Sequence, residues 1–185
     1  MRLFAAVRPP PEVLAEVATS VDSLPPDVRL RWTSPEQWHL TLAFYGEVTD
    51  QVTETLDVRL RRLAARTAPL TLRCSGAGAF ARPSRARVLW IGVQGDREGL
   101  IALAASARAA GRRSGLDMPD RGYRPHLSIA RARATADLAT TVAQLSPFAS
   151  AAWTVHELSL LRSELGKGDE GRPRYTTIGD YPLAG

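Results

Sequence analysis

The sequence contains a single cysteine, Cys74, among its 185 residues, and this scarcity excludes several classes of protein. One thiol cannot form an internal disulfide, and without a cysteine cluster there is no thiolate zinc site. No run approaches the roughly 18 apolar residues that are needed to cross a bilayer. The apolar stretch after Met1 is short and is broken by prolines, unlike a secretory signal peptide. We therefore expect a cytoplasmic protein with no membrane association.

Lysine is almost missing as well, because Lys167 is the only lysine among 24 basic residues. The others are arginines, and with 19 acidic residues the formal net charge is +5. The planar guanidinium group pairs well with phosphate, so this composition favours a phosphate-bearing partner. A genome-wide preference for arginine explains the bias equally well, and net charge alone does not decide between the two.

The composition, with 44% hydrophobic and 23% charged residues, is that of a globular protein with one core or two small lobes. Apolar periodicity predicts strands at 2–7, 38–45, 69–74, 87–93, 125–130, 152–161 and 174–178. It predicts helices between the prolines at 9–11 and 25–26, at 50–67, near 97–114 and near 135–145. The segment 76–80 is expected to be a bend, and 163–174 a mobile hairpin loop.

The order of these elements indicates an internal duplication. Leu3 lies 36 residues before His39, and Val88 lies 38 residues before His126. Both halves have the order strand, helix, His-bearing strand, helix, strand, and their centres are H-L-T-L at 39–42 and H-L-S-I at 126–129. We predict a single domain over residues 1–185, made of two intertwined lobes whose His-bearing strands face each other across a pseudo-twofold axis.

Each lobe is expected to present an imidazole beside a hydroxyl. In a strand alternate side chains share a face, so His39 lies beside Thr41 and His126 beside Ser128. One cleft between the lobes then receives two histidines and two hydroxyls. This set suits phosphodiester chemistry without a metal, since one imidazole can accept a proton while the other donates one. Taken separately, each histidine is typical of a structural residue, whereas the duplicated pair favours catalysis.

The paired motifs, in the contexts WHLTLAFYGEV and YRPHLSIAR, resemble the 2H phosphoesterase superfamily. Within it they are most similar to the RNA 2′,3′-cyclic phosphodiesterases, historically called 2′-5′ RNA ligases. The resemblance covers nearly the whole chain, including RLFAAV, RVLWIGV and LSLLRSELGKGDEGRPRY. It implies an α+β fold of two pseudo-symmetric lobes, each an antiparallel sheet with helices on its outer face, around a V-shaped central cleft. It also implies hydrolysis of an RNA terminal 2′,3′-cyclic phosphate to a 2′-phosphomonoester, with no metal or cofactor, and weak reversible 2′-5′ joining.

The resemblance also implies a role for each motif residue. His39 is expected to be the general acid and His126 the general base, while Thr41, Ser128 and Arg131 hold the substrate phosphate. Strict alternation would send Arg131 to the face opposite His126, so its role requires a β-bulge or a strand that ends one residue earlier.

Further aromatic and basic residues have two interpretations each. Trp32, Tyr123 and Arg124 are candidates for lining the cleft, and an aromatic ring there can stack on a nucleobase or pack in the core. His156, without a following hydroxyl residue, is expected to be structural or on the surface. The arginines at 59, 61, 62 and 66 form a basic cluster on a helix, which is typical of a solvated face or of an RNA contact.

Two other functions remain open. The first is a related phosphodiesterase that acts on small cyclic nucleotides or on 2′-5′ oligonucleotides. The second is a non-catalytic module that binds RNA ends or nucleotides. The presence of both histidines favours catalysis, with RNA ends or cyclic nucleotides as substrate, and we expect a monomer.

Overall fold

The structure, a computed structural model, describes residues 1–119, 122–168 and 173–185. Its strands are β1 (Arg2–Val7), β2 (Leu30–Trp32), β3 (Leu40–Glu47), β4 (Leu70–Arg82), β5 (Arg85–Gly95), β6 (His126–Ala136), β7 (Trp153–Val155), β8 (Glu157–Glu164) and β9 (Arg174–Pro182). Its helices are α1 (Pro11–Asp22), the 3₁₀ helix η1 (Pro35–Gln37), α2 (Asp50–Ala64), α3 (Arg97–Arg113) and α4 (Ala139–Leu145). None of the described helices is long and apolar enough to span a membrane.

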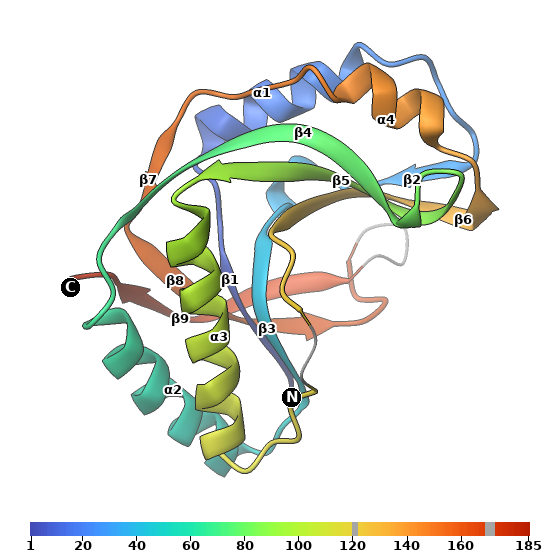
Figure 1. The fold of residues 1–185 in the computed structure, drawn as a ribbon. Coiled ribbons are helices and arrows are strands. Elements are labelled where there is room, and N and C mark those ends of the chain that lie inside the picture. Colours follow the sequence, from blue (N-terminus) through green and yellow to red (C-terminus); the bar gives the residue numbers. More distant parts are fainter. Residues whose placement is uncertain (120–121, 169–172) are drawn as a thin grey trace.

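The strands form one strongly curled antiparallel sheet (Figure 1). Its order is β7-β4-β5-β6-β3-β1-β8-β9, with β2 paired to β6. The two halves of the sheet meet at β3 and β6, where Leu40 pairs with Leu127. These leucines hold the same position in the two histidine motifs. β3, which directly follows His39, and β6, which begins at His126, are therefore neighbours at the centre of the sheet.

Each half of the sheet takes a strand from the other half of the chain. Next to β3 lies β1, and the strand beyond it is β8, which comes from the C-terminal half of the sequence. Next to β6 lies β5, and the strand beyond it is β4, which comes from the N-terminal half. The order outward from the centre is thus equivalent on both sides. The internal duplication stays a prediction, which this exchange of strands supports.

The helices cover the outside of the curled sheet. Figure 1 shows α1 and α4 over the half that contains β4 and β5, and α2 with α3 beside the half that contains β3, β1, β8 and β9. α2 and α3 pack against each other, α3 packs on β3, and α4 packs on β4. Thr49 is the N-cap residue of α2, and its hydroxyl accepts a hydrogen bond from the Val52 amide.

β1 is buried on both of its faces. Alternate residues from Leu3 onward join the main core between the sheet and the helices. Phe4 and Ala6 point the other way and form a second, small apolar cluster with Leu161, against which Tyr175 packs. The continuous apolar run RLFAAV follows from this double burial. The second cluster matters for function because it supports His39, as described below.

The segment 76–80 is not the bend that the sequence predicts. β4 continues through it to Arg82, and a register shift between Cys74 and Ala77 accommodates it as a β-bulge. Gly76 has a φ of 70°, which glycine adopts without strain. Gly78 lies opposite Trp90, and a Cβ at position 78 would collide with the indole ring. Glycine is present here because Trp90 occupies the space.

Two other predicted elements differ from the structure, and one strand was missed. The strand predicted at 152–161 is two strands separated at His156, of which β7 pairs with β4 and β8 with β1. The helix predicted near 135–145 begins only at Ala139, because β6 extends to Ala136. The short strand β2 was not predicted. β8 and β9 form the predicted hairpin, but residues 169–172 of its connection lie outside the described residues.

Candidate active site

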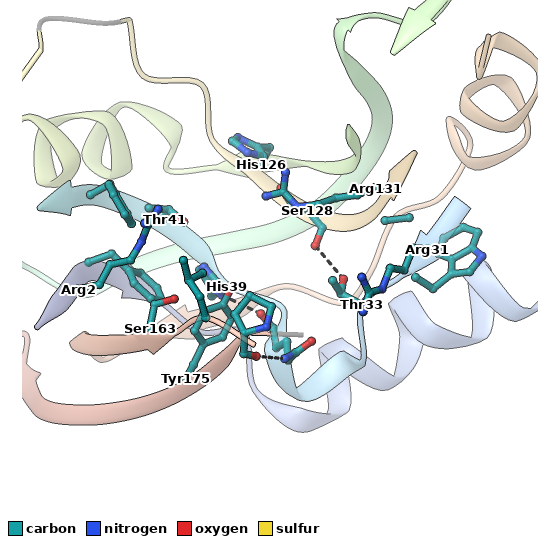
Figure 2. A pocket seen from close by; sticks show the side chains of 17 residues that line it. Arg2, Arg31, Thr33, His39, Thr41, His126, Ser128, Arg131, Ser163 and Tyr175 are labelled. Atoms are coloured by element: carbon teal, nitrogen blue, oxygen red, sulfur yellow. Dashed lines mark hydrogen bonds between the residues drawn. The ribbon is translucent and has the colours of Figure 1, made fainter. Parts of the chain in front are cut away.

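A cavity of about 430 Å³ opens where the two halves of the sheet meet, and both motif histidines line it (Figure 2). Of the predicted site residues, the cavity brings together His39, Thr41, His126, Ser128, Arg131 and Trp32. The other lining residues are Arg2, Phe4, Arg31, Thr33, Gln37, Phe44, Ala130, Ser163, Leu165, Pro173 and Tyr175.

Strand alternation places each histidine beside its hydroxyl. Leu40 and Leu127, which follow the two histidines, are fully buried on the core side of the sheet. The imidazoles and the side chains of Thr41 and Ser128 therefore face the cavity. In the part of the chain that the structure describes, neither hydroxyl bonds to another residue, so both are available to a ligand.

Both imidazoles are held in the same way by the backbone. Nδ1 of His39 donates a hydrogen bond of 2.7 Å to the carbonyl oxygen of Gln37. Nδ1 of His126 donates one of the same length to the carbonyl oxygen of Arg124. A carbonyl can only accept, so Nδ1 carries the proton in each ring. Nε2 is then the nitrogen that exchanges a proton with a ligand, and in the neutral ring it is a free acceptor.

His39 is enclosed by aromatic rings. Its centroid lies 4.8 Å from that of Phe4 and 5.2 Å from that of Tyr175, which meets it edge-on at 89°. Burial among these groups lowers the pKa of His39 from 6.5 to about 4, because the charged imidazolium loses its hydration. Positive charge at His126 and Arg8 contributes to this lowered pKa, and the hydrogen bond to the Gln37 carbonyl acts against it. In the free protein at neutral pH, His39 is uncharged.

His126 has a comparable setting on the other half of the sheet. Phe80 meets its ring edge-on at 88° with the centroids 4.8 Å apart, and the Trp90 centroid lies at 6.3 Å. Burial lowers the pKa of His126, and the nearby positive charges of Arg124 and Arg131 act in the same direction. Each histidine is thus backed by two aromatic rings and fixed through one backbone carbonyl.

A β-bulge brings Arg131 to the cavity. In the pairing of β5 with β6, Leu89 lies opposite Ala130 but Trp90 lies opposite Ser128, so the register shifts by one residue. The shift breaks strict alternation, and Arg131 lines the cavity together with Ser128. The sequence allowed either a β-bulge or a strand that ends before Arg131. The bulge is correct, since β6 continues to Ala136.

Tyr123 and Arg124 are not among the described residues that line the cavity, in contrast to the expectation for them. Tyr123 packs against the main core, and its hydroxyl is buried. The Arg124 guanidinium lies over the Phe80 ring, 5.5 Å from its centroid, while its carbonyl holds His126. Arg124 therefore acts on His126 through its carbonyl, and neither side chain lines the cavity.

Several lining residues were missed by sequence reasoning, and Phe44 is the clearest case. Alternation from His39 does not predict it, because a register shift in the β1–β3 pairing, between Thr41 and Ala43, changes the phase of β3. The Phe44 ring is 47% exposed, and the Arg2 guanidinium lies 4.8 Å from its centroid. A bulge of this kind leaves no signal in a single sequence.

Comparisons with known proteins identify the family of this chain. The family model described as the 2′-5′ RNA ligase superfamily matches residues 9–167. The RNA 2′,3′-cyclic phosphodiesterase of Escherichia coli K12 is 31% identical over 98% of this chain and 96% of its own length. The protein of that name from Thermus thermophilus is 33% identical over 100% of this chain and 91% of its own. The one from Geobacillus stearothermophilus is 31% identical over 83% of this chain, which spans about half of that longer relative (48%).

Solved structures show the same fold. The crystal structure of TT0787 from Thermus thermophilus has a TM-score of 0.80 and 31% identity, covering 100% of this chain and 99% of its own. The structure of E. coli LigT in its apo form has a TM-score of 0.79 and 29% identity, covering 100% and 98%. The predicted fold class is confirmed. With the family match over most of the sequence, the resemblance drawn from the two histidine motifs is confirmed too, and the chain belongs to the 2′-5′ RNA ligase superfamily.

Proposed function

We propose that the protein is an RNA 2′,3′-cyclic phosphodiesterase that hydrolyses the terminal cyclic phosphate to a 2′-phosphomonoester. The curated relatives that carry this name support the general activity. The observation that carries the proposal for this chain is the matched pair of imidazoles in one cavity. Both donate from Nδ1 to a backbone carbonyl, and both leave Nε2 for proton exchange.

The two histidines divide the proton transfers. Nε2 of His126 takes a proton from water, whose oxygen forms a bond to phosphorus. The bond from phosphorus to the 3′ oxygen breaks on the opposite side, in line with the attack. The 3′ oxygen receives the proton from Nε2 of His39. The products are a 2′-phosphomonoester and a free 3′ hydroxyl, and exchange of one proton with solvent restores both rings.

The hydroxyls and an arginine stabilise the charge on the reacting phosphate. Thr41 and Ser128 donate hydrogen bonds to the non-bridging oxygens, where negative charge accumulates in the transition state. Arg131 supplies a fixed positive charge beside them. These three groups come from both halves of the sheet, so the phosphate is held between the two histidines.

The acid role of His39 depends on the substrate. Its pKa of about 4 leaves it neutral in the free protein at pH 7. A phosphate anion placed beside the ring favours the imidazolium form and raises this pKa. With substrate bound, Nε2 of His39 therefore takes up a proton from solvent, and this proton later passes to the leaving 3′ oxygen.

We also propose that hydrolysis needs no metal and that the same site supports weak 2′-5′ joining. Joining follows the same steps as hydrolysis, because the 5′ hydroxyl of a second RNA can take the place of water as the nucleophile. The product is then a 2′-5′ phosphodiester with a free 3′ hydroxyl. In the described chain, no three His, Cys, Asp or Glu side chains are grouped so as to hold a metal ion. A monomeric, cytoplasmic enzyme stays a prediction.

The experiment is product analysis on a short RNA that ends in a 2′,3′-cyclic phosphate, with a chelator present. Wild type is compared with the His39→Ala/His126→Ala double variant and with His156→Ala as a matched control. We expect a 2′-phosphate product from wild type and from the control, and none from the double variant. A cyclic mononucleotide is tested as a second substrate, and the comparison distinguishes an enzyme that acts on RNA ends from one that acts on small nucleotides.

Other outcomes have definite meanings. A 3′-phosphate product would be consistent with catalysis by the two histidines, but the leaving group would then be the 2′ oxygen. Activity that is lost in chelator and restored by a divalent ion would contradict the metal-free reaction. If the wild type binds the RNA but forms no product, the protein is not a catalyst of this reaction. The result would instead favour a module that only binds RNA ends.

A further inference from the structure

A second concave surface lies between α2 and α3 and shares no residue with the catalytic cavity. This groove, which we call the α2–α3 groove, has a volume of about 510 Å³. Its lining residues are Arg59, Arg62, Leu63, Arg66, Thr67, Ser106, Ala109, Ala110 and Arg113. Small side chains on α3 make its floor, so the arginines project over an open surface.

The four arginines converge from two helices. Arg59 and Arg62 are one turn apart on α2, and Arg66 follows just after the helix ends at Ala64. Together they extend over about 10 Å at the helical rise per residue. Arg113, the last residue of α3, completes the groove from the other helix. A line of positive charges over this length matches an extended polyanion better than a single small anion.

In the part of the chain that the structure describes, none of these four arginines forms an ion pair with a carboxylate. The described residues that line the groove include no Asp or Glu, and Glu54 lies in the adjoining hollow. Elsewhere arginines pair with acids, for example Arg61 with Asp57 at 3.2 Å and Arg174 with Glu164 at 2.8 Å.

The arginines of the groove also repel one another. Like charges about one helical turn apart destabilise a helix. A general preference for arginine in the composition does not explain why these side chains gather on one groove, whereas a bound anion would offset their repulsion.

We propose that the α2–α3 groove binds the phosphate backbone of single-stranded RNA, as a contact outside the catalytic cavity. The choice of RNA over another polyanion rests on the proposed function. Arginine guanidinium groups form paired hydrogen bonds with phosphate oxygens and read no base, so the contact is independent of sequence. The groove therefore raises the affinity for longer RNA without taking part in hydrolysis.

The test measures binding of an oligouridylate of about 20 nucleotides with a 3′ hydroxyl end, by fluorescence anisotropy over a series of salt concentrations. The groove variant is Arg59→Gln/Arg62→Gln/Arg66→Gln. Its matched control, Arg73→Gln/Arg82→Gln/Arg97→Gln, removes the same charge from exposed positions that line neither cavity. A lysine version of the groove variant keeps the charge and separates the effect of charge from that of the guanidinium groups. If the triple glutamine variant folds poorly, Arg62→Gln alone takes its place, with a slope reduced by about 0.7.

We expect the groove variant to bind more weakly than the control, with a salt slope reduced by about 2, since each arginine–phosphate contact contributes about 0.7. The lysine version should keep the wild-type slope. Hydrolysis of a dinucleotide 2′,3′-cyclic phosphate should be unchanged in the groove variant.

Equal affinities and slopes for the groove variant and the control would overturn the proposal. Polyglutamate that displaces the RNA at equal charge concentration would assign the groove to an acidic protein instead. Loss of dinucleotide hydrolysis in the groove variant would contradict a separate site. If wild type binds RNA through the groove but hydrolyses nothing, the proposed function fails while this inference stands.

Discussion

The burial of His39 predicts a measurable loss of stability in acid. In the unfolded chain this imidazole has the ordinary pKa of 6.5, and in the folded protein burial lowers the pKa to about 4. Below pH 6.5 the unfolded state therefore takes up a proton that the folded state does not bind. The stabilisation is complete above pH 6.5 and is lost as the pH falls through 6.5 towards 4.

The size of the effect follows from the two pKa values. Between neutral pH and pH 4 the difference in proton uptake lowers the free energy of unfolding by about 3 kcal/mol. At pH 5.5 the loss is already between about 1 and 2 kcal/mol.

The assay is urea denaturation at pH 8 and at pH 5.5. His39→Gln removes the titrating ring, so its free energy of unfolding should fall by about 1–2 kcal/mol less than that of wild type between the two pH values. The control is His156→Gln, at an exposed position, which should keep the wild-type pH dependence. If wild type and His39→Gln show the same pH dependence, His39 is not held neutral by burial and the account of its environment is wrong.

Three further predictions concern activity and packing. Because both catalytic imidazoles have lowered pKa values, the bell-shaped profile of kcat/KM should have its maximum below pH 6.5, and a maximum near pH 8 would contradict this. Arg131→Gln should lower kcat/KM by about 10- to 100-fold, as expected for a charge-assisted phosphate contact, whereas Arg133→Gln two residues along the strand should have little effect. Gly78→Ala should destabilise the protein by about 1–3 kcal/mol in a thermal melt and reduce kcat, because the new Cβ displaces the Trp90 ring behind the base. Gly122→Ala, with open space around it, should be neutral in both measurements.

The strands and helices with strong periodicity could be predicted from the sequence, and the exchange between halves could not. The residues of β1 and α2 were predicted within a few positions, because an apolar run and a helical stripe are local signals. The continuous apolar pattern at 152–161 concealed a break at His156, since the pattern carries no information on which edge of the sheet each part joins. The glycines at 76 and 78 argued against a strand, but the space needed by Trp90 outweighs the low strand preference of glycine.

In the candidate site, too, local patterns could be predicted and long-range pairings could not. The pairing of each histidine with a hydroxyl two residues later depends only on alternation, and both pairs lie in the cavity. Arg131 could be included only on condition of a bulge. Phe44 and Tyr175 depend on register shifts and on long-range strand pairing, which no local pattern encodes. The backbone carbonyls that fix the histidines were also missed, because every residue has a carbonyl and its direction appears only in the fold.

The exchange of strands makes the site a property of the whole chain. His39 precedes β3, yet the half of the sheet around β3 is completed by β8 and β9 from the C-terminal part of the sequence. The half around His126 is likewise completed by β4 from the N-terminal part. Where the halves meet, Leu40 and Leu127 are fully buried, and a large-to-small substitution of such a residue costs roughly 2–5 kcal/mol. The contact between Leu40 and Leu127 therefore joins the two halves of the sheet and also keeps both imidazoles at one cavity. A fragment with one motif would lack both its partner histidine and an outer strand of its own half of the sheet.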